Sequence, residues 1–261
     1  MLKTRLIPVL YIKNGLIVRS EDFEYHQIIG NVVNEAQRYN DWNVDELIYI
    51  DISIENEYDS RRDDHKIKSV ASISEILKMV SKTCFMPLTF GGGIRSIEQV
   101  DYLIQKGADK ISLNTGAIIN PDFINQVALK YGSQALVLSV DYKIIENRAV
   151  VYSTFGKKDT QISVFDWVLE AQKLGVGEIF LNCIDRDGKA CGYDIDTIGR
   201  VVDLLSIPVI ACGGAGSEFD FIDLALQTKV SGIAAGNWFH FVERSYPRAK
   251  QFLKKNGINV R

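Results

Sequence analysis

Eight short apolar runs, rich in residues that favour β-strands, alternate with amphipathic helical stretches along this chain. The runs are the segments 5–11, 46–51, 87–90, 110–113, 135–141, 178–182, 207–211 and 232–235. Most have no polar face, which is typical of parallel strands covered on both sides. Helices are predicted at 32–40, 73–80, 97–107 and 164–175, and the last two of these end at glycine.

This alternation predicts an α/β protein, a (β/α)8 TIM barrel. The alternative is a doubly wound open sheet. Such a sheet would normally carry a glycine fingerprint after its first strand, and the sequence LYIKNG is not one.

An internal repeat favours the barrel. MPLTFGGGIRS at 86–96 matches IPVIACGGAGS at 207–217, and KISLNTGAI at 110–118 matches GIAAGNWFH at 232–240. Each half therefore supplies the same kinds of strand in the same order, which an open sheet does not explain.

We expect one domain over residues 1–261, built from two pseudo-symmetric half-barrels of about 1–130 and 131–261. The first half carries roughly 11 additional residues by the repeat offset. The segment 54–69 is polar and rich in charge, and we expect it to form a loop at the active face.

Charge and hydropathy argue against several classes of function. The chain holds 30 Lys and Arg against 33 Asp and Glu, with no basic block, so nucleic acid is not expected as a partner. No apolar run approaches the roughly 20 residues of a membrane helix, and the N-terminus resembles a strand rather than a signal peptide. Four cysteines without a CxxC pair indicate reduced thiols in a cytoplasmic protein. Neither a metal nor a cofactor is expected.

Glycine-rich turns follow the third and seventh predicted strands, at 91–93 and 213–216. Glycine lets backbone N–H groups approach an oxyanion closely. Small polar stretches at 114–115 and 236–237 follow the fourth and eighth strands and are placed to complete two phosphate cradles. Two cradles at matched positions predict a ligand with a phosphate at each end. The alternative is that the glycines only permit tight turns.

Three carboxylates, Asp51, Asp141 and Asp187, stand at predicted strand ends, where a barrel places its active site. Asp141 follows a very apolar strand, which is expected to raise its pKa and suit it to acid–base work. Asp187 has an alternative role in a turn that contains an internal Asp–Arg pair. The repeat places Tyr11 opposite Asp141, and a phenol is a poor base at neutral pH.

The motifs RLIPVL, VDELIYIDIS, PLTFGGGIRS, GADKISLNTGAI, GEIFLNCIDRDGKACGYD and IPVIACGGAGS resemble the cyclase subunit of imidazole glycerol phosphate synthase, a family of histidine biosynthesis. The resemblance runs nearly end to end. It implies a TIM barrel that takes ammonia from a glutaminase subunit docked beneath it. It also implies that the ammonia attacks a bisphosphorylated ribulosyl intermediate at the top face, giving imidazole glycerol phosphate and an aminoimidazole carboxamide ribotide.

The resemblance also assigns residues. Positions matching a charged ammonia gate and its partner interface are Arg5, Glu46, Asp109, Lys110 and Glu178. From the sequence alone, these would be solvated charges at strand starts. Positions matching the phosphate and substrate sites are Arg19, Asp51, Gly93, Asn114, Thr115, Asn182, Asp187, Gly188, Gly214, Gly236 and Asn237. Of the two catalytic aspartates of the family, one matches Asp141 and the other falls on Tyr11.

Three further positions depart from the pattern: Arg19 replaces a lysine, Asn182 a threonine and Asn237 a serine. With these departures, the sequence resembles a divergent branch of the family that serves surface polysaccharides. Members of that branch work with a glutaminase and an ATP-dependent sugar amidotransferase to make acetamidino sugars. We therefore expect an ammonia-channelling barrel of that branch. The alternatives are a genuine cyclase of histidine biosynthesis, and a scaffold that binds a phosphorylated ligand without catalysis.

Overall fold

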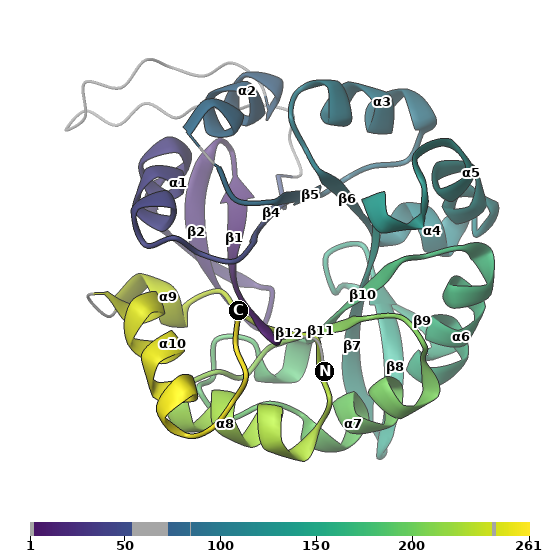
Figure 1. The fold of residues 1–261 in the computed structure, drawn as a ribbon. Coiled ribbons are helices and arrows are strands. Elements are labelled where there is room, and N and C mark those ends of the chain that lie inside the picture. Colours follow the sequence, from purple (N-terminus) through teal and green to yellow (C-terminus); the bar gives the residue numbers. More distant parts are fainter. Residues whose placement is uncertain (1–2, 54–72, 84, 242–243) are drawn as a thin grey trace.

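The strands form a closed ring surrounded by helices (Figure 1). The computed structural model describes residues 3–53, 73–83, 85–241 and 244–261, so the predicted loop at 54–69 lies outside the described residues. The eight barrel strands are β1 (Arg5–Lys13), β4 (Leu47–Asp51), β5 (Leu88–Gly91), β6 (Lys110–Leu113), β7 (Leu136–Ile145), β10 (Glu178–Cys183), β11 (Val209–Cys212) and β12 (Gly232–Ala235). Each is parallel to its neighbours, and β12 pairs with β1 to close the barrel. The predicted (β/α)8 barrel is confirmed, and the open sheet is wrong.

Helices cover the outside of this ring. They are α1 (Val32–Asp41), α2 (Ile73–Thr83), α3 (Ile97–Gln105), α4 (Thr115–Ile119), α5 (Asp122–Tyr131), α6 (Val164–Leu174), α7 (Ile195–Leu204), α8 (Glu218–Gln227), α9 (Trp238–Phe241) and α10 (Ser245–Lys255). The four predicted helices correspond to α1, α2, α3 and α6. Gly175 ends α6 at a φ of 103°, in the left-handed conformation that glycine adopts without strain. Among the described residues, none of these helices is long and apolar enough to cross a membrane.

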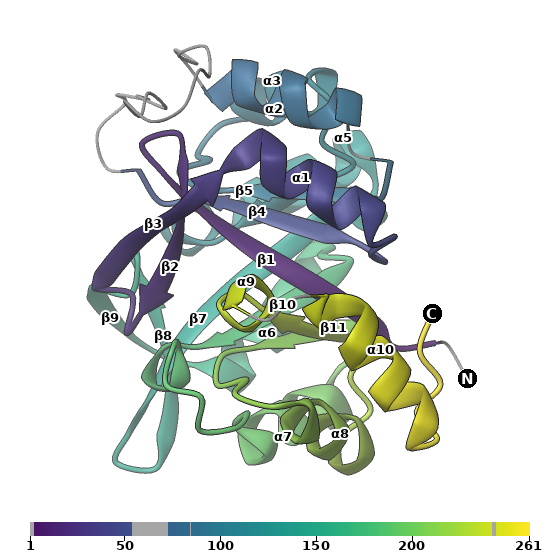
Figure 2. The same cartoon turned by 90° about the vertical axis from the view of Figure 1, so that its left-hand side faces the viewer.

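Two antiparallel hairpins, which the sequence did not predict, extend the barrel at the C-terminal ends of its strands. β2 (Leu16–Glu21) and β3 (Tyr25–Asn31) follow β1, whereas β8 (Arg148–Ser153) and β9 (Lys158–Ser163) follow β7. Figure 2 shows both hairpins at the end of the barrel opposite to the chain termini. They occupy equivalent positions in the two halves, because β1 and β7 are the first strands of each repeat.

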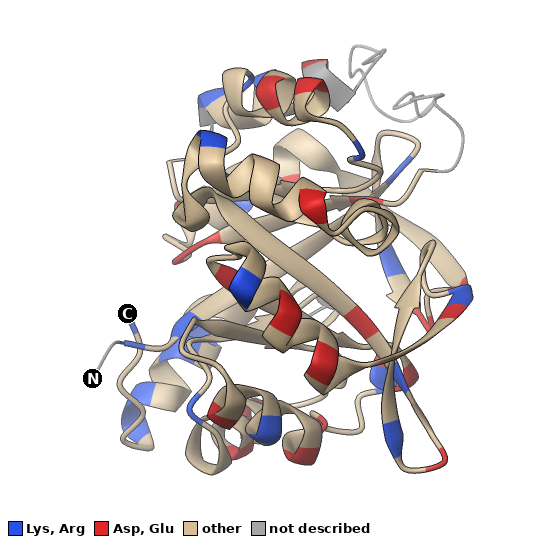
Figure 3. Ribbon diagram, turned by 90° about the vertical axis from the view of Figure 1, so that its right-hand side faces the viewer, with Lys and Arg blue, Asp and Glu red and all other residues tan. Residues whose placement is uncertain are grey.

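Alternate residues of each strand point into the barrel. The inward cluster is apolar and includes Ile7, Val9, Ile48, Val137 and Phe180, each at most 1% exposed. A separate, larger cluster packs the outward faces of the strands against the helices. On the ribbon in Figure 3, basic and acidic positions are interspersed along the outer helices.

Candidate active site

Four charged side chains close the N-terminal end of the barrel. Arg5 contacts both glutamates of this ring: its Nη1 lies 2.5 Å from Oε2 of Glu46, and its Nη2 pairs with Glu178. Lys110 Nζ lies 2.9 Å from Glu46 and 2.8 Å from Glu178. Arg5, Lys110 and Glu178 begin β1, β6 and β10, and Glu46 directly precedes β4, so all four lie at the N-terminal end of the closed barrel. Each acid pairs with both bases, so the ring is closed and has no net charge.

The bases of this ring remain charged at neutral pH. Burial lowers the pKa of Lys110, but the two glutamates beside it outweigh that effect and the pKa lies above its ordinary value. The pKa of Arg5 is raised by the same balance. Both glutamates are buried. The sequence alone indicated solvated charges at these positions, and the geometry instead gives a partly buried network.

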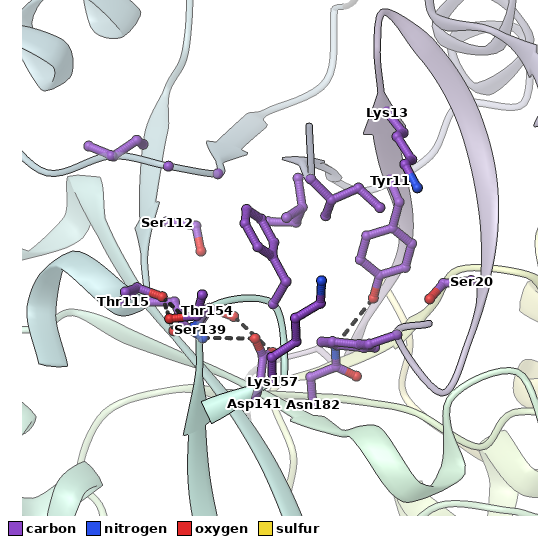
Figure 4. Close-up of a pocket in the computed structure, with 18 of the residues that line it drawn as sticks. Tyr11, Lys13, Ser20, Ser112, Thr115, Ser139, Asp141, Thr154, Lys157 and Asn182 are labelled. Atoms are coloured by element: carbon purple, nitrogen blue, oxygen red, sulfur yellow. Dashed lines mark hydrogen bonds between the residues drawn. The ribbon is translucent and has the colours of Figure 1, made fainter. Parts of the chain in front are cut away.

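A polar centre lies at the opposite end of the barrel, around Asp141 (Figure 4). Its Oδ2 accepts a hydrogen bond of 2.8 Å from Asn114 Nδ2, and Ser139 Oγ donates to Oδ1 at 3.4 Å. Burial raises the pKa of Asp141 to about 7; hydrogen bonds from Ser139 and Asn182 lower it, and the charge of Asp187 raises it further. A carboxyl group with this pKa gives or takes a proton readily near neutral pH.

Tyr11 lies beside this carboxyl group, at the end of β1. Its hydroxyl accepts a hydrogen bond of 3.2 Å from Asn182 Nδ2 on β10. Burial raises the pKa of Tyr11 well above 10, and the nearby thiol of Cys212 and the carboxylates of Asp187 and Asp141 raise it further. The phenol therefore stays protonated at neutral pH and cannot replace an aspartate as a base.

The predicted ligand-binding residues are divided between two cavities. The larger, of about 590 Å³, is lined by residues that include Gly93, Asn114, Thr115, Asp141 and Asn182, with Tyr11 in its wall. The smaller, of about 290 Å³, is lined by Arg19, Asp187, Gly188, Gly214, Gly236 and Asn237. The two cavities share no lining residue. Each corresponds to one of the two predicted phosphate cradles.

In the glycine turn of the larger cavity, Gly92 is tightly packed against the backbone, whereas Gly93 adjoins open space. Gly92 has a φ of +114°, and a β-carbon there would lie 2.1 Å from the carbonyl oxygen of Asp51. Gly93 has a φ of +65°, and a β-carbon there would meet nothing within 4 Å. The turn therefore requires glycine at 92 for packing, whereas position 93 presents its backbone to the cavity.

Asp51 and Asp109, like the four residues of the charged ring, lie outside both cavities. Asp51 is buried, and its Oδ1 accepts hydrogen bonds from the backbone and hydroxyl of Ser53 at 3.0 and 2.7 Å. Asp109 is exposed at the N-terminal end of the barrel, where its Oδ2 accepts a hydrogen bond of 2.8 Å from the backbone of Leu88. Among the described residues, the structure gives Asp51 a role in loop geometry, and its predicted contact with substrate stays a prediction.

The family model described as "Histidine biosynthesis protein" matches residues 5–245. The chain belongs to this family. Full-length relatives are named imidazole glycerol phosphate synthase subunit HisF: one from Chlorobium phaeovibrioides is 41% identical over 261 residues, and one from Natranaerobius thermophilus is 38% identical, with all of both chains covered in each case. A third, from a Thermotoga species (strain RQ2), is 38% identical, with all of this chain and 98% of the relative covered.

Three further residues that line the larger cavity of this family member were not predicted from the sequence. Lys13 on β1, His26 on β3 and Lys157 beside β9 line the larger cavity. Lys13 Nζ lies 3.4 Å from Nδ1 of His26. Burial lowers the pKa of His26, and the nearby charges of Lys13 and Lys157 lower it further. These residues lie on or beside the two hairpins, so finding them required recognition of the strands that follow β1 and β7.

Proposed function

We propose that this chain is the ammonia-using barrel subunit of a glutamine amidotransferase of the imidazole glycerol phosphate synthase type. The observation that carries the proposal is the pair of sites at opposite ends of one barrel. A closed, neutral ring of ion pairs lies at the N-terminal end, and a carboxyl group with a pKa of about 7 lies at the C-terminal end. The name shared by full-length relatives supports it.

In this proposal a glutaminase subunit docks at the N-terminal end and releases ammonia beneath the ring of Arg5, Glu46, Lys110 and Glu178. Neutral ammonia enters an apolar interior at far lower cost than ammonium does. The inward side chains of Ile7, Ile48 and Phe180 are fully or almost fully buried. Passage therefore requires opening of the ring and movement of these side chains, which the docked partner would drive.

The first candidate reaction is the cyclisation that the name of the relatives implies. Asp141 would act as the general acid or base on a bisphosphorylated ribulosyl substrate, with Asn114 holding its carboxyl group in place. The identity of about 40% over the whole chain supports this candidate. The phosphate groups would lie against the turns that contain Gly93 and Gly214, one in each cavity.

A second candidate reaction is favoured by Tyr11. The resemblance to the cyclase subunit places an aspartate at this position, and a protonated phenol cannot supply its acid–base function. The barrel would then pass ammonia to an acceptor held by another protein, such as an ATP-dependent sugar amidotransferase that makes acetamidino sugars.

One assay separates the two candidates. The purified chain receives ammonium and the bisphosphorylated ribulosyl substrate, and cyclised product is measured for the wild type, Tyr11→Asp and Asp141→Asn. The cyclisation candidate predicts turnover by the wild type, with a loss of about 10²–10⁴-fold in Asp141→Asn. The delivery candidate predicts no wild-type turnover. Rapid wild-type turnover would exclude ammonia delivery as the main role of the chain.

A further inference from the structure

We propose that Lys13 and His26 form a proton relay in the larger cavity, in which His26 donates a proton to the oxygen of a ligand carbonyl group and takes one from Lys13. The inference rests on the proposed function, because it requires ammonia to react with a carbonyl group in this cavity. It deepens that function by naming a second proton-transfer group besides Asp141. Neither Lys13 nor His26 belongs to the residues assigned by resemblance.

Addition of ammonia to a carbonyl group needs two proton transfers. The oxygen must gain a proton, and the nitrogen must lose one. Asp141 lines the larger cavity and, with a pKa of about 7, can serve one of these transfers. Tyr11 is a poor donor for the other, because burial raises its pKa well above 10. The second transfer therefore calls for another group that lines the same cavity.

The first hairpin brings Lys13 and His26 to this cavity. Lys13 lies two residues beyond Tyr11 on β1, so the two side chains leave the strand on the same side. His26 on β3 is the cross-strand partner of Ser20 on β2, and such partners share one face of a hairpin. All four residues line the larger cavity. Figure 4 shows Lys13 and Asp141 entering the pocket from different sides.

The contact between the two side chains fixes the tautomer of the imidazole ring. Nζ of Lys13 lies 3.4 Å from Nδ1 of His26. An ammonium group has three donors and no acceptor, so Nδ1 must accept in this contact. In a neutral ring the proton then lies on Nε2. His26 therefore offers the ligand a donor at Nε2 and receives a donor at Nδ1, which is the arrangement of a relay.

The surroundings of His26 keep its ring neutral at neutral pH. Burial lowers its pKa most and the charge of Lys13 lowers it next, whereas a hydrogen bond with the backbone of Glu24 raises it and Lys157 lowers it further. The net pKa lies below the ordinary value of 6.5. The charged groups that line this cavity are Lys13, Glu24, Arg95, Asp141 and Lys157. Bases outnumber acids among them, which also stabilises a developing oxyanion.

The relay acts as the nitrogen of ammonia bonds to the carbonyl carbon. An electron pair of the C=O bond moves to oxygen, and this oxygen takes the Nε2 proton of His26. Nδ1 takes a proton from Lys13 at the same time, so that Lys13 becomes a neutral amine. The nitrogen of the adduct is positive after the bond forms, and it gives a proton to the carboxylate of Asp141. The product is a neutral carbinolamine, with one proton moved in net from Lys13 to Asp141. Exchange with water then restores both groups.

The test measures turnover of the full chain with ammonium and the bisphosphorylated ribulosyl substrate, and follows the imidazole of His26 by ¹⁵N NMR. His26→Gln cannot relay a proton. Lys13→Met removes both the charge and the proton, whereas Lys13→Arg keeps the charge and holds its protons too tightly to donate them. Lys254→Met, at an exposed lysine in the last turn of α10, is the matched control.

We expect His26→Gln, Lys13→Met and Lys13→Arg each to lower turnover at neutral pH by about 10²-fold or more, and Lys254→Met to change it by less than about twofold. In the NMR spectra, the pKa of His26 should lie below its ordinary value of 6.5 in the wild type and in Lys13→Arg. It should rise in Lys13→Met, which removes a nearby positive charge.

A pH profile separates the relay from a structural role. A protonated imidazole is itself an acid, so at low pH His26 no longer needs the proton of Lys13. The deficit of Lys13→Met relative to the wild type should therefore shrink to about tenfold or less as pH falls through the pKa of His26, whereas that of His26→Gln should not. Titration of the substrate, of ammonia and of Asp141 affects all three proteins and cancels in these ratios. A deficit of Lys13→Met that is independent of pH would contradict the relay.

The other outcomes are equally decisive. Full turnover by Lys13→Arg would show that only the charge at this position matters, and would overturn the relay. Turnover of His26→Gln equal to that of Lys254→Met would overturn the inference and leave the cyclisation candidate standing. Absence of wild-type turnover would also overturn it, and would leave ammonia delivery as the role of the chain.

Discussion

Nδ2 of Asn182 donates a hydrogen bond of 3.2 Å to the hydroxyl of Tyr11, joining β10 to β1 across the C-terminal end of the barrel. Both residues depart from the pattern that the resemblance to the cyclase subunit implies, and they depart together. The bond holds the phenol beside Asp141 and leaves Oδ1 of Asn182 facing the larger cavity. This pair therefore determines which polar groups of β1 and β10 lie beside Asp141.

Removal of the Tyr11 hydroxyl should destabilise the fold. In Tyr11→Phe the buried amide of Asn182 loses its acceptor, and we expect the free energy of unfolding to fall by about 1–2 kcal/mol in urea denaturation. Tyr102→Phe, at a side chain that is 44% exposed, is the matched control and should change it by less than about 0.5 kcal/mol. Equal stability of the two variants would show that the hydrogen bond contributes nothing.

Asp141 should make stability depend on pH in the opposite sense to a salt-bridged carboxylate. Its pKa is raised from 3.8 to about 7 on folding, so the folded state binds more protons than the unfolded state between these values. Stability is therefore highest below about pH 4 for this group, falls as pH rises to about 7, and is then constant. Each pKa unit corresponds to about 1.4 kcal/mol, and because the carboxyl group partly faces the cavity we expect a loss of about 2 kcal/mol.

The measurement for Asp141 is the difference in unfolding free energy between the wild type and Asp141→Asn across this pH range. Carboxyl groups that do not interact with Asp141 contribute equally to both proteins and cancel. The difference should move in favour of the variant as the pH rises. A constant difference would mean that Asp141 keeps an ordinary pKa in the folded chain.

Removal of one base from the charged ring should uncouple the reaction of the barrel from glutamine hydrolysis. Lys110→Met leaves Glu46 and Glu178 with Arg5 alone and gives the ring a net charge of −1, which favours retention of ammonium over passage of ammonia. We expect loss of glutamine-dependent activity with retention of activity on added ammonium. Removing one partner of a buried ion pair also costs about 3 kcal/mol of stability. Lys130→Met breaks the exposed pair with Asp101 and is the control, with an expected cost below about 1 kcal/mol.

Two adjacent glycines should tolerate substitution very differently. Gly93→Ala adds a methyl group to open space at a φ of +65°, and the conformational strain should cost about 1–2 kcal/mol. Gly92→Ala adds the strain of a φ of +114° and a collision with the backbone of Asp51, and we expect a loss above about 4 kcal/mol or failure to fold. Thermal and urea unfolding of both variants compares them. Similar costs would show that the turn relaxes around position 92.

The barrel could be predicted from the sequence because its strands are apolar runs and its two halves repeat the same motifs. The hairpins could not, because the continuations of β1 and β7 mix polar and apolar residues, and no residue of β3 or β9 is fully buried. Lys13, His26 and Lys157 were missed for the same reason. The repeat places Tyr11 opposite Asp141, yet that match alone does not indicate that an antiparallel hairpin follows each of the two strands.

The individual site residues could be named from the sequence, but their grouping could not. Resemblance placed Asn114 and Asn237 in equivalent cradles. In the folded chain, however, Asn114 donates a hydrogen bond to Asp141, whereas both ends of the Asn237 amide are occupied by Ser20. The grouping of the ion-pair ring could not be predicted either. The order of the strands brings Arg5 within reach of Glu178, although 173 positions separate them in the sequence. Such contacts depend on the closure of the barrel.

The central claim is that nitrogen from glutamine passes the charged ring and reaches a reaction at or beyond the C-terminal end. The most direct measurement supplies the chain, together with any glutaminase that co-purifies with it, with glutamine labelled with ¹⁵N in the amide, in excess unlabelled ammonium. Each candidate acceptor is tested: the bisphosphorylated ribulosyl substrate, and an acetamido sugar with its amidotransferase. We predict ¹⁵N in the product with the wild type and unlabelled nitrogen with Lys110→Met. A wild-type product that contains only unlabelled nitrogen, or a chain that binds no glutaminase, would contradict the account.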